Sequence, residues 1–193
     1  MKVLIACEFS GVVRRAFRDA GHDAWSCDLL PAEDGGEHYQ DDVLSILDEP
    51  KTFGEWDMMI AHPPCTYLAN SGVRWLYEQP GRRDKMEDAI SFFRTLMYAR
   101  IPLIAIENPI QHKHARLPKP DQIVQPWQFG DNETKATCLW LKGLPNLVPS
   151  TTVKPDNVQA RVWRMAPGPN RQKERSRFFP SIARAMAEQW GQK

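Results

Sequence analysis

Short apolar segments alternate along the chain with segments in which apolar residues recur at helical spacing. Residues 3–7 form an apolar run that breaks at Gly11, and apolar positions then follow a helical period over residues 12–20. A second apolar run, residues 24–28, ends on an aspartate. This part of the chain therefore predicts a strand, a glycine-containing turn, a helix and a second strand.

The alternation continues through the middle of the chain. A short helix is predicted near residues 43–47 and a longer one over residues 86–100, and strands are predicted over residues 56–61, 103–106 and 137–141. Strands that alternate with helices are typical of parallel sheets covered by helices on both faces. The sequence therefore predicts an α/β fold with a doubly wound, mostly parallel sheet.

Two segments show no clear period. Residues 66–83 are rich in glycine, asparagine, serine and arginine and are predicted to form a mobile loop, while residues 143–175 are rich in proline and polar residues. Helical spacing returns near the end of the chain. A last helix is predicted there, with four side chains facing inward: Ile182, Ala185, Met186 and Trp190.

The length of 193 residues and the 42% content of hydrophobic residues suit one domain with one core. We predict a single domain over residues 1–193, with the core sheet in residues 1–142 and a basic, proline-rich extension with a terminal helix in residues 143–193. The sequence has no apolar run of about 18 residues and no signal-peptide pattern. We therefore expect a cytoplasmic protein that does not enter a membrane.

The four cysteines lie far apart, with no paired spacing and no matching histidine cluster, so the sequence predicts neither a metal site nor a disulfide framework. Cys7, Cys27 and Cys138 are interpreted as small buried hydrophobic residues. Cys65 has a different context, because it follows two prolines at the end of a predicted strand.

The net charge of +1 conceals an uneven distribution of charge. Residues 154–184 contain eight basic and two acidic residues, so that this segment alone carries a charge of +6. Such a segment suits a partner that bears phosphate groups. An ordinary solvated tail would account for the charge equally well.

The predicted strands end on residues that suit a nucleoside-containing cofactor. Phe9-Ser10-Gly11 follow the first strand, Asp28 ends the second, and Asp42 follows the third. In an open α/β sheet these ends meet at one crevice, where a carboxylate after the second strand binds ribose hydroxyls. The alternative is a plain turn and two helix caps. The full glycine fingerprint of dinucleotide sites is absent, which argues against a dinucleotide.

Pro63-Pro64-Cys65 and Glu107-Asn108 end two apolar strands and carry the candidate chemistry. Two prolines fix the backbone where the thiol is presented, which suits a nucleophile. We expect nearby cations to favour its thiolate form: His62, Arg74, Arg82 and Arg83. A carboxylate directly after an apolar strand is costly to bury unless it has a partner or a functional role. Because burial disfavours the charged form, we expect a raised pKa for Glu107. Its alternative roles are a helix cap or an ion pair with Lys113.

The order and sheet positions of these motifs resemble those of the DNA cytosine carbon-5 methyltransferases, including the short members found among phage and prophage proteins. The resemblance covers roughly residues 3–142. It implies the Rossmann-like, class I fold of S-adenosylmethionine-dependent methyltransferases, with six or seven mostly parallel strands. It also implies that S-adenosylmethionine is the cofactor and that DNA is the partner.

The resemblance also assigns roles to individual residues. Asp28 would bind the ribose of S-adenosylmethionine and Asp42 its adenine amine, and the cofactor site as a whole would comprise Phe9, Ser10, Gly11, Asp28, Asp42 and Pro63. Cys65 would attack carbon 6 of the base, because this addition makes carbon 5 nucleophilic enough to accept a methyl group. Glu107 would hold ring nitrogen 3, and Asn108 would orient it.

This chain departs from the family pattern in two ways. Where the family has a glutamine and two arginines after a glycine turn, this chain has Glu133, Lys135 and Thr137 after Gly130. Lys135 is then the one cation expected to support the base, without the planar fork of an arginine. The family's separate target-recognition domain also has no counterpart, so we expect the readout of DNA sequence to be weak or absent.

Two basic segments with aromatic residues are candidates for binding a phosphate backbone. One precedes the long helix and the other lies in the extension beside Trp163; together they contain Arg74, Trp75, Arg82, Arg83, Arg171, Arg175 and Arg177. The alternative is that the tryptophans belong to the core and the arginines are merely solvated.

Three other functions remain open from the sequence. An exocyclic amino methyltransferase would stack an aromatic residue such as Tyr67 on the base. A methyltransferase acting on RNA or on a free pyrimidine nucleotide would not require a recognition domain. A non-catalytic nucleic-acid-binding descendant of the enzyme would explain the altered residues after Gly130.

Overall fold

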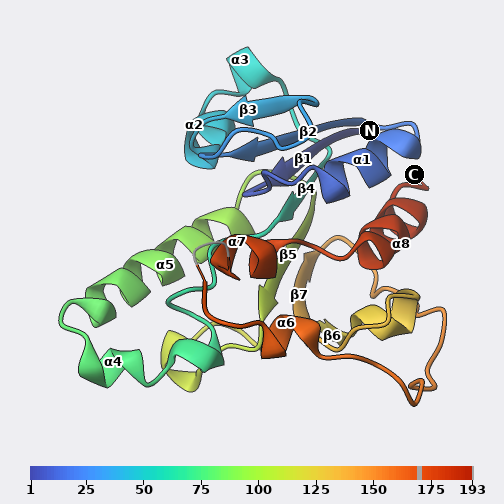
Figure 1. Cartoon of the computed structure of the whole chain (residues 1–193). Coiled ribbons are helices and arrows are strands. Elements are labelled where there is room, and N and C mark those ends of the chain that lie inside the picture. Colours follow the sequence, from blue (N-terminus) through green and yellow to red (C-terminus); the bar gives the residue numbers. More distant parts are fainter. Residues whose placement is uncertain (169–170, 193) are drawn as a thin grey trace.

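A computed structural model describes residues 1–168 and 171–192 of the chain. Pro169, Asn170 and Lys193, which the predicted domain and its extension include, lie outside the described residues. Within the described part, helices cover both faces of a twisted sheet, and the chain begins and ends on the same side of the molecule (Figure 1).

The sheet has seven strands in the order β3-β2-β1-β4-β5-β7-β6. The strands are β1 (Lys2–Ala6), β2 (Asp23–Asp28), β3 (His38–Gln40), β4 (Met58–Ala61), β5 (Leu103–Pro109), β6 (Gln122–Val124) and β7 (Thr137–Lys142). The first five strands in this order pair in parallel, whereas β7 is antiparallel to β5 and β6 is antiparallel to β7. The prediction of a doubly wound, mostly parallel sheet is confirmed.

The helices are α1 (Val12–Asp19), α2 (Val43–Asp48), α3 (Pro50–Phe53), α4 (Trp75–Glu78), α5 (Arg82–Met97), α6 (Arg161–Arg164), α7 (Arg171–Ser176) and α8 (Pro180–Trp190). Three 3-10 turns complete the elements: η1 (Asn70–Gly72), η2 (Lys113–Ala115) and η3 (Pro126–Phe129). Helices α1 and α8 lie side by side on one face of the sheet, and α5 crosses the other face (Figure 1).

Two apolar layers form because successive strand residues point to opposite faces. Leu4 of β1 faces the layer that contains Phe93 of α5, whereas its neighbour Ile5 faces the layer that contains Phe17 of α1 and Met186 of α8. All five side chains are fully buried. The two layers hold the central strands in register, so the strand ends form a firm edge on which a site can be built.

The structure differs from the predicted elements mainly where the elements are short. Strand β6 was not predicted, because three residues are too few to show a period of two. The segment 66–83, predicted as a loop, contains η1, α4 and the start of α5. The aperiodic segment 143–175 contains α6 and most of α7. The terminal helix was predicted correctly, and its four inward-facing side chains are buried.

Candidate functional site

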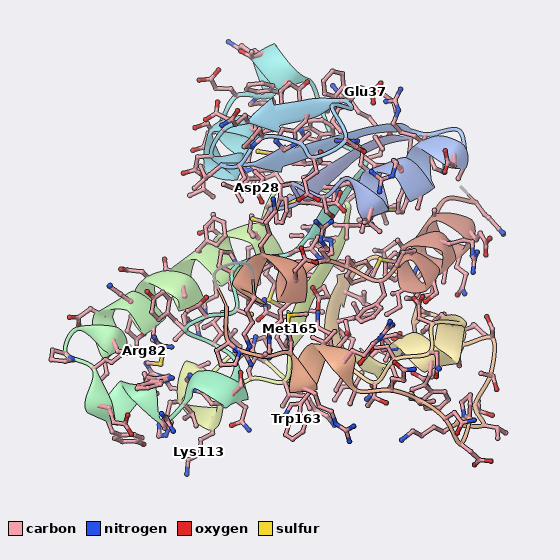
Figure 2. All side chains as sticks on the ribbon, viewed as in Figure 1. Asp28, Glu37, Arg82, Lys113, Trp163 and Met165 are labelled. Atoms are coloured by element: carbon pink, nitrogen blue, oxygen red, sulfur yellow. The ribbon has the colours of Figure 1, made fainter. Side chains whose placement is uncertain are left out.

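A pocket of about 1200 Å³ opens at the carboxyl edge of the sheet, where residues at the ends of β1, β2, β4 and β5 line one wall. Residues 134–136, just before β7, also line the pocket, because β7 runs antiparallel to β5 and therefore begins at this edge. The segment around α4 and the extension around α6 and α7 supply the other walls. Figure 2 shows Asp28, Arg82 and Trp163 on three sides of this region.

The four residues assigned to the chemistry all line this pocket. Cys65 lies in the segment after β4, Glu107 and Asn108 lie on β5, and Lys135 lies just before β7. The parallel pairing of β4 with β5, in which Ala61 is the partner of Ile106, explains why Cys65 and Glu107 reach the same place.

Glu107 is buried and has a histidine partner that the sequence did not predict. His62 Nδ1 lies 3.1 Å from Glu107 Oε2. Burial alone would raise the pKa of Glu107, but the hydrogen bond with His62 and the nearby charge of Lys135 lower it below its ordinary value. The expectation of a raised pKa was therefore wrong, because it considered burial without these partners.

Asn108 fixes the segment that presents the thiol. Its Nδ2 atom donates a hydrogen bond of 2.8 Å to the carbonyl oxygen of Pro63, and the side chain is almost completely buried. The carbonyl oxygen of Cys65 accepts from the amides of Leu68 and Ala69 at 3.0 and 2.8 Å. Cys65 therefore begins a tight turn whose start is bound to β5.

The thiol of Cys65 is partly buried and faces mixed charges. Burial raises its pKa above the ordinary value and Glu107 raises it further, while Lys135 and Arg175 act in the opposite direction. The expected shift towards the thiolate is therefore not found. The cations that do favour the thiolate are Lys135, which the family resemblance had placed at the base, and Arg175 of α7, which the sequence did not place beside Cys65.

Three of the six residues assigned to the cofactor line the pocket: Phe9, Asp28 and Pro63. Asp28 also accepts a hydrogen bond of 2.9 Å from the amide of Leu30, which lines the pocket as well. Asp42 instead caps the N-terminus of α2, where it accepts from the amide of Leu44 at 3.0 Å. This is the helix-cap role that the sequence left open.

Ser10 and Gly11 form the turn into α1 and do not line the pocket. Gly11 has a φ of 69°, in the left-handed region that favours glycine. The buried carboxylate of Glu8, which the sequence analysis missed, accepts from the amides of Val13 and Arg14 at 2.7 and 3.2 Å. The amides that hold a pyrophosphate in dinucleotide sites are therefore already bonded to a carboxylate.

An acidic residue joins α7 to the loop after β2. Glu33 forms ion pairs with Lys173 at 2.8 Å and with Arg177 at 2.7 Å. The hydrogen bond from Lys173 is the main reason why the pKa of Glu33 is lowered. The ammonium group of Lys173 also lies 5.4 Å from the ring centroid of Phe9. The extension thus closes over the side of the pocket that contains Phe9.

The residues assigned to nucleic acid fall into two groups. Four of them line the pocket: Trp75, Arg82, Arg171 and Arg175. The other three contact neighbouring side chains: Arg74 lies over Trp75, Arg83 lies over Tyr77, and Arg177 pairs with Glu33 and Glu174. Trp163, which is 74% exposed, lines the pocket from the extension. Trp163 is therefore a surface residue rather than a core residue.

The altered positions after Gly130 have separate roles. The buried carboxylate of Glu133 pairs with Arg161 Nε at 3.0 Å and accepts from the amide of Val162 at 3.4 Å. Glu133 thereby anchors the extension beside the pocket. Of the three altered residues, Lys135 is the one that lines the pocket.

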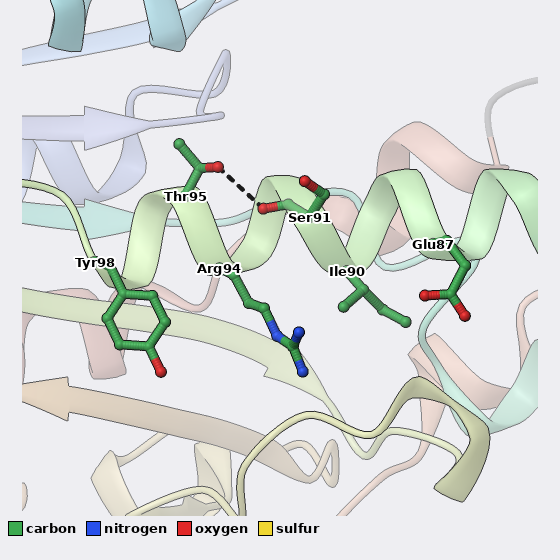
Figure 3. Close-up of a pocket in the computed structure, with 6 residues that line it drawn as sticks. All are labelled: Glu87, Ile90, Ser91, Arg94, Thr95 and Tyr98. Carbon is green, nitrogen blue, oxygen red and sulfur yellow. Dashed lines mark hydrogen bonds between the residues drawn. The ribbon is translucent and has the colours of Figure 1, made fainter.

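A second, smaller hollow of about 370 Å³ lies along α5 (Figure 3). All six of its lining residues come from this helix and the residue that ends it, among them Arg94 and Tyr98, and the hydroxyl of Thr95 bonds to the carbonyl oxygen of Ser91. Its six lining residues include no strand end and no cysteine. The pocket at the sheet edge is therefore the candidate site.

Within residues 1–168 and 171–192, no helix is long and apolar enough to cross a membrane. The same residues contain no group of three or more histidine, cysteine, aspartate or glutamate side chains arranged to hold a metal ion.

No model of a known protein family matches the sequence, and no curated protein matches it. Solved structures that resemble the fold include two methyltransferases. A prophage-encoded protein of E. coli described as a DNA modification methyltransferase is 16% identical, with a TM-score of 0.51, and the match covers 79% of this chain and 51% of that one. The Entamoeba histolytica methyltransferase EhMeth is 15% identical, with a TM-score of 0.53, covering 80% of this chain and 57% of that one.

This chain therefore spans little more than half the length of the two proteins. At this level of identity the likeness concerns the fold. Together with the seven-stranded, mostly parallel sheet, it assigns the chain the Rossmann-like class I methyltransferase fold.

Proposed function

We propose that this protein is an S-adenosylmethionine-dependent methyltransferase that transfers a methyl group to carbon 5 of cytosine in DNA through a covalent adduct with Cys65. One observation carries the proposal. Cys65 shares a pocket with Glu107 and Asn108, whose buried Oε1 and Oδ1 atoms have no hydrogen-bond partner among the described residues. Buried oxygens without partners favour a polar ligand such as a pyrimidine base.

The other end of the pocket fits the proposed cofactor. The ring of Phe9 and the side chain of Leu30 offer apolar contacts, and Asp28 offers a carboxylate to ribose hydroxyls. The carboxylate of Glu8 at the start of α1 suits a nucleoside without phosphate groups better than a dinucleotide. When bound, S-adenosylmethionine supplies a methyl group activated by a sulfonium. Phe9, Asp28 and Pro63 are the residues that would hold it.

Cys65 would act on the base before methyl transfer. Its sulfur adds to carbon 6, and the ring electrons that shift as a result make carbon 5 nucleophilic. Because burial and Glu107 raise the pKa of the thiol, Cys65 rests as a thiol and loses its proton as the bond forms. The turn bound to β5 through Asn108 keeps the sulfur in place for this step.

Glu107 and Lys135 would stabilise the charge that develops on the ring. Glu107 contacts ring nitrogen 3, and the ammonium of Lys135 stands on the same wall of the pocket. A lysine is a point charge that lacks the bidentate geometry of arginine, so we expect the support of the base to be weaker than with an arginine pair.

The mouth of the pocket suits a nucleic-acid strand. Trp75 of α4 and Trp163 of α6 line the pocket, and so do Arg82, Arg171 and Arg175. Exposed aromatic rings stack on bases, and arginines neutralise phosphates. The target base of a duplex would have to flip out to reach Cys65.

The exocyclic amino methyltransferase finds less support. Tyr67, the residue expected to stack on the base in that reaction, is not among the residues that line the pocket. Its ring instead lies against the guanidinium of Arg82, with a distance of 4.7 Å to the ring centroid.

Covalent trapping tests the proposal. Purified protein is incubated with S-adenosylmethionine and a DNA duplex that contains 5-fluorocytosine, whose carbon-5 substituent cannot leave. We expect an adduct that survives denaturation and that peptide mass spectrometry locates at Cys65. The same assay with RNA or with the free nucleotide identifies the substrate class. Absence of an adduct on every substrate would reject the covalent mechanism.

A further inference from the structure

His62 and Glu107 form a buried pair whose geometry is fixed from three sides. The two side chains are each about 10% exposed, and His62 Nδ1 lies 3.1 Å from Glu107 Oε2. The backbone amide of His62 donates to the carbonyl oxygen of Ala6 at 2.9 Å. The ring of Phe178 packs on the imidazole with a centroid distance of 4.8 Å. The histidine is therefore held in one orientation towards Glu107.

Each member of the pair also has one buried atom without a partner among the described residues. These atoms are His62 Nε2 and Glu107 Oε1, and both residues line the pocket. Buried polar atoms are nearly always hydrogen-bonded unless a ligand or a reaction requires them. His62 Nε2 and Glu107 Oε1 are therefore both available to form a hydrogen bond with a base or to accept a proton.

We propose that His62 is a positioning residue that orients Glu107 and supplies, through it, the proton that ring nitrogen 3 of cytosine takes up. This inference rests on the proposed function, and it adds a residue that the sequence analysis did not connect with Glu107. In this step the proton passes from His62 Nδ1 to the carboxylate, and from the carboxyl group to the ring nitrogen.

The step balances in atoms and electrons. The sulfur–hydrogen bond of Cys65 breaks and its proton leaves to solvent, while the sulfur forms a bond to carbon 6. The carbon 5–carbon 6 double bond shifts to carbons 4 and 5, and the electron pair of the carbon 4–nitrogen 3 double bond moves onto nitrogen 3. That nitrogen takes the proton from the His62–Glu107 pair. It returns the proton to the pair once the carbon 4–nitrogen 3 double bond has formed again, and the expelled thiolate of Cys65 regains a proton from solvent.

A carboxylate alone cannot serve as the proton donor for this nitrogen. The hydrogen bond with His62 and the charge of Lys135 keep Glu107 ionised, so its proton must come from a neighbour. The other ionisable groups near the pair are the thiol of Cys65, the cations Lys135 and Arg175 that act on this thiol, and Cys138 on β7, whose pKa Glu107 raises. Among the described groups, His62 is the one hydrogen-bonded to the carboxylate of Glu107.

The test compares two variants across a range of pH. His62→Asn keeps an amide donor near the position of Nδ1 but cannot titrate, whereas His62→Ala removes the donor as well. The rate of adduct formation with 5-fluorocytosine DNA is divided by the rate of Cys65 alkylation by iodoacetamide. Both reactions need the thiolate, so changes in the ionisation of Cys65 cancel in this ratio. The ratio therefore reports how well the protein donates a proton to ring nitrogen 3. His22→Asn, a change in a half-buried histidine beside Phe17 and outside the pocket, is the matched control.

We expect the ratio for the wild-type protein to stay level to higher pH than the ratio for His62→Asn. An imidazole ordinarily retains its proton to higher pH than a carboxyl group does. In His62→Asn the ratio should fall about tenfold for each pH unit once the carboxyl group has ionised, and His62→Ala should be slower at every pH. His22→Asn should follow the wild type.

Two results would overturn the inference, and they differ from a failure of the proposed function. If His62→Asn gives the same ratio as the wild type at every pH, His62 has only a structural role. If the ratio in His62→Asn is lowered by the same factor at every pH, no proton passes through His62. A wild-type protein that forms no adduct would instead reject the proposed function, and the inference with it.

Discussion

The pocket brings the carboxylate of Glu107 close enough to the thiol of Cys65 to influence the ionisation of the thiol. Glu107 raises the pKa of Cys65, and Lys135 lowers the pKa of both groups. One lysine thus stabilises the ionised form of the carboxylate and of the nucleophile at once. This double effect offers a physical reason for a cation at position 135 despite the missing arginine pair.

Replacement of Cys65 by serine should abolish turnover and adduct formation. A hydroxyl group is far less ionised than a thiol at neutral pH and is a much weaker nucleophile. Affinity for S-adenosylmethionine should remain nearly unchanged, because in the proposed mechanism the thiol of Cys65 contacts the base, whereas Phe9, Asp28 and Pro63 hold the cofactor. Methyl transfer from radiolabelled cofactor and calorimetry measure the two quantities. As a control, Cys138→Ala changes a buried thiol outside the pocket and should keep its activity. Normal turnover in Cys65→Ser would reject the mechanism.

Replacement of Asp28 by alanine should weaken the binding of S-adenosylmethionine by about 1.5 to 3 kcal/mol, the range for hydrogen bonds to charged groups. Asp28→Asn should lose less, because it retains an acceptor for the amide of Leu30. Isothermal calorimetry measures both affinities, with Asp48→Ala at the exposed end of α2 as the control. Equal affinities in all three variants would place the cofactor elsewhere.

At the scale of elements, the extension is joined to the core sheet by ion pairs and one buried carboxylate. Glu133 holds Arg161 at the start of α6, and Glu33 holds Lys173 and Arg177 in and just after α7. The Glu33 pairs are partly exposed, so salt weakens them, whereas the carboxylate of Glu133 is buried. The end of the extension near α7 should therefore be the one that opens more easily.

Replacement of Glu33 by glutamine should speed the release of S-adenosylmethionine. Exposed ion pairs contribute about 0.2 to 1 kcal/mol each, so the loss of two pairs should raise the dissociation rate a few-fold. Stopped-flow fluorescence at low and high salt measures this rate. Glu87→Gln, which removes the exposed pair of Glu87 with Arg116 outside the pocket, is the matched control. A dissociation rate equal to that of the wild type at low salt would show that α7 does not retain the cofactor.

At the scale of the whole molecule, the small net charge of +1 conceals an uneven distribution of charge, and the fold brings several of the cations to the pocket. Arg171 and Arg175 line the pocket from α7, and Arg82 lines it from the start of α5. Segments about ninety positions apart in the sequence thus contribute cations to one opening. Such a concentration of charge attracts a polyanion at long range.

Reversal of charge at Arg171 and Arg175 should weaken DNA binding alike for all sequences. The slope of log affinity against log salt should flatten by about one unit for each lost phosphate contact. Fluorescence anisotropy over a salt series measures this slope. Arg100→Glu changes an exposed cation outside the pocket and should leave the slope unaltered. An unchanged slope in the double variant would mean that DNA binds at another surface.

The sequence alone was sufficient for the class of fold and for the convergence of four candidate residues on one pocket. The apolar periods of strands and helices are local properties of the chain, so the alternation could be read without knowledge of any contact. In a parallel sheet the carboxyl ends of strands meet at one edge. The convergence of Phe9, Asp28, Cys65 and Glu107 on one pocket follows from these two facts, and the structure places all four there.

Only the tertiary structure decided the contacts between distant segments. The pairing of His62 with Glu107 and the carboxylate of Glu8 at the start of α1 depend on orientations that no local pattern encodes. For Asp42 the sequence left a cofactor role and a helix-cap role open, and the structure shows the cap. The raised pKa of Cys65 and the lowered pKa of Glu107 depend on burial and on charges separated along the chain but close in space. Electrostatic energy varies with the distance between charges, and folding alone sets that distance.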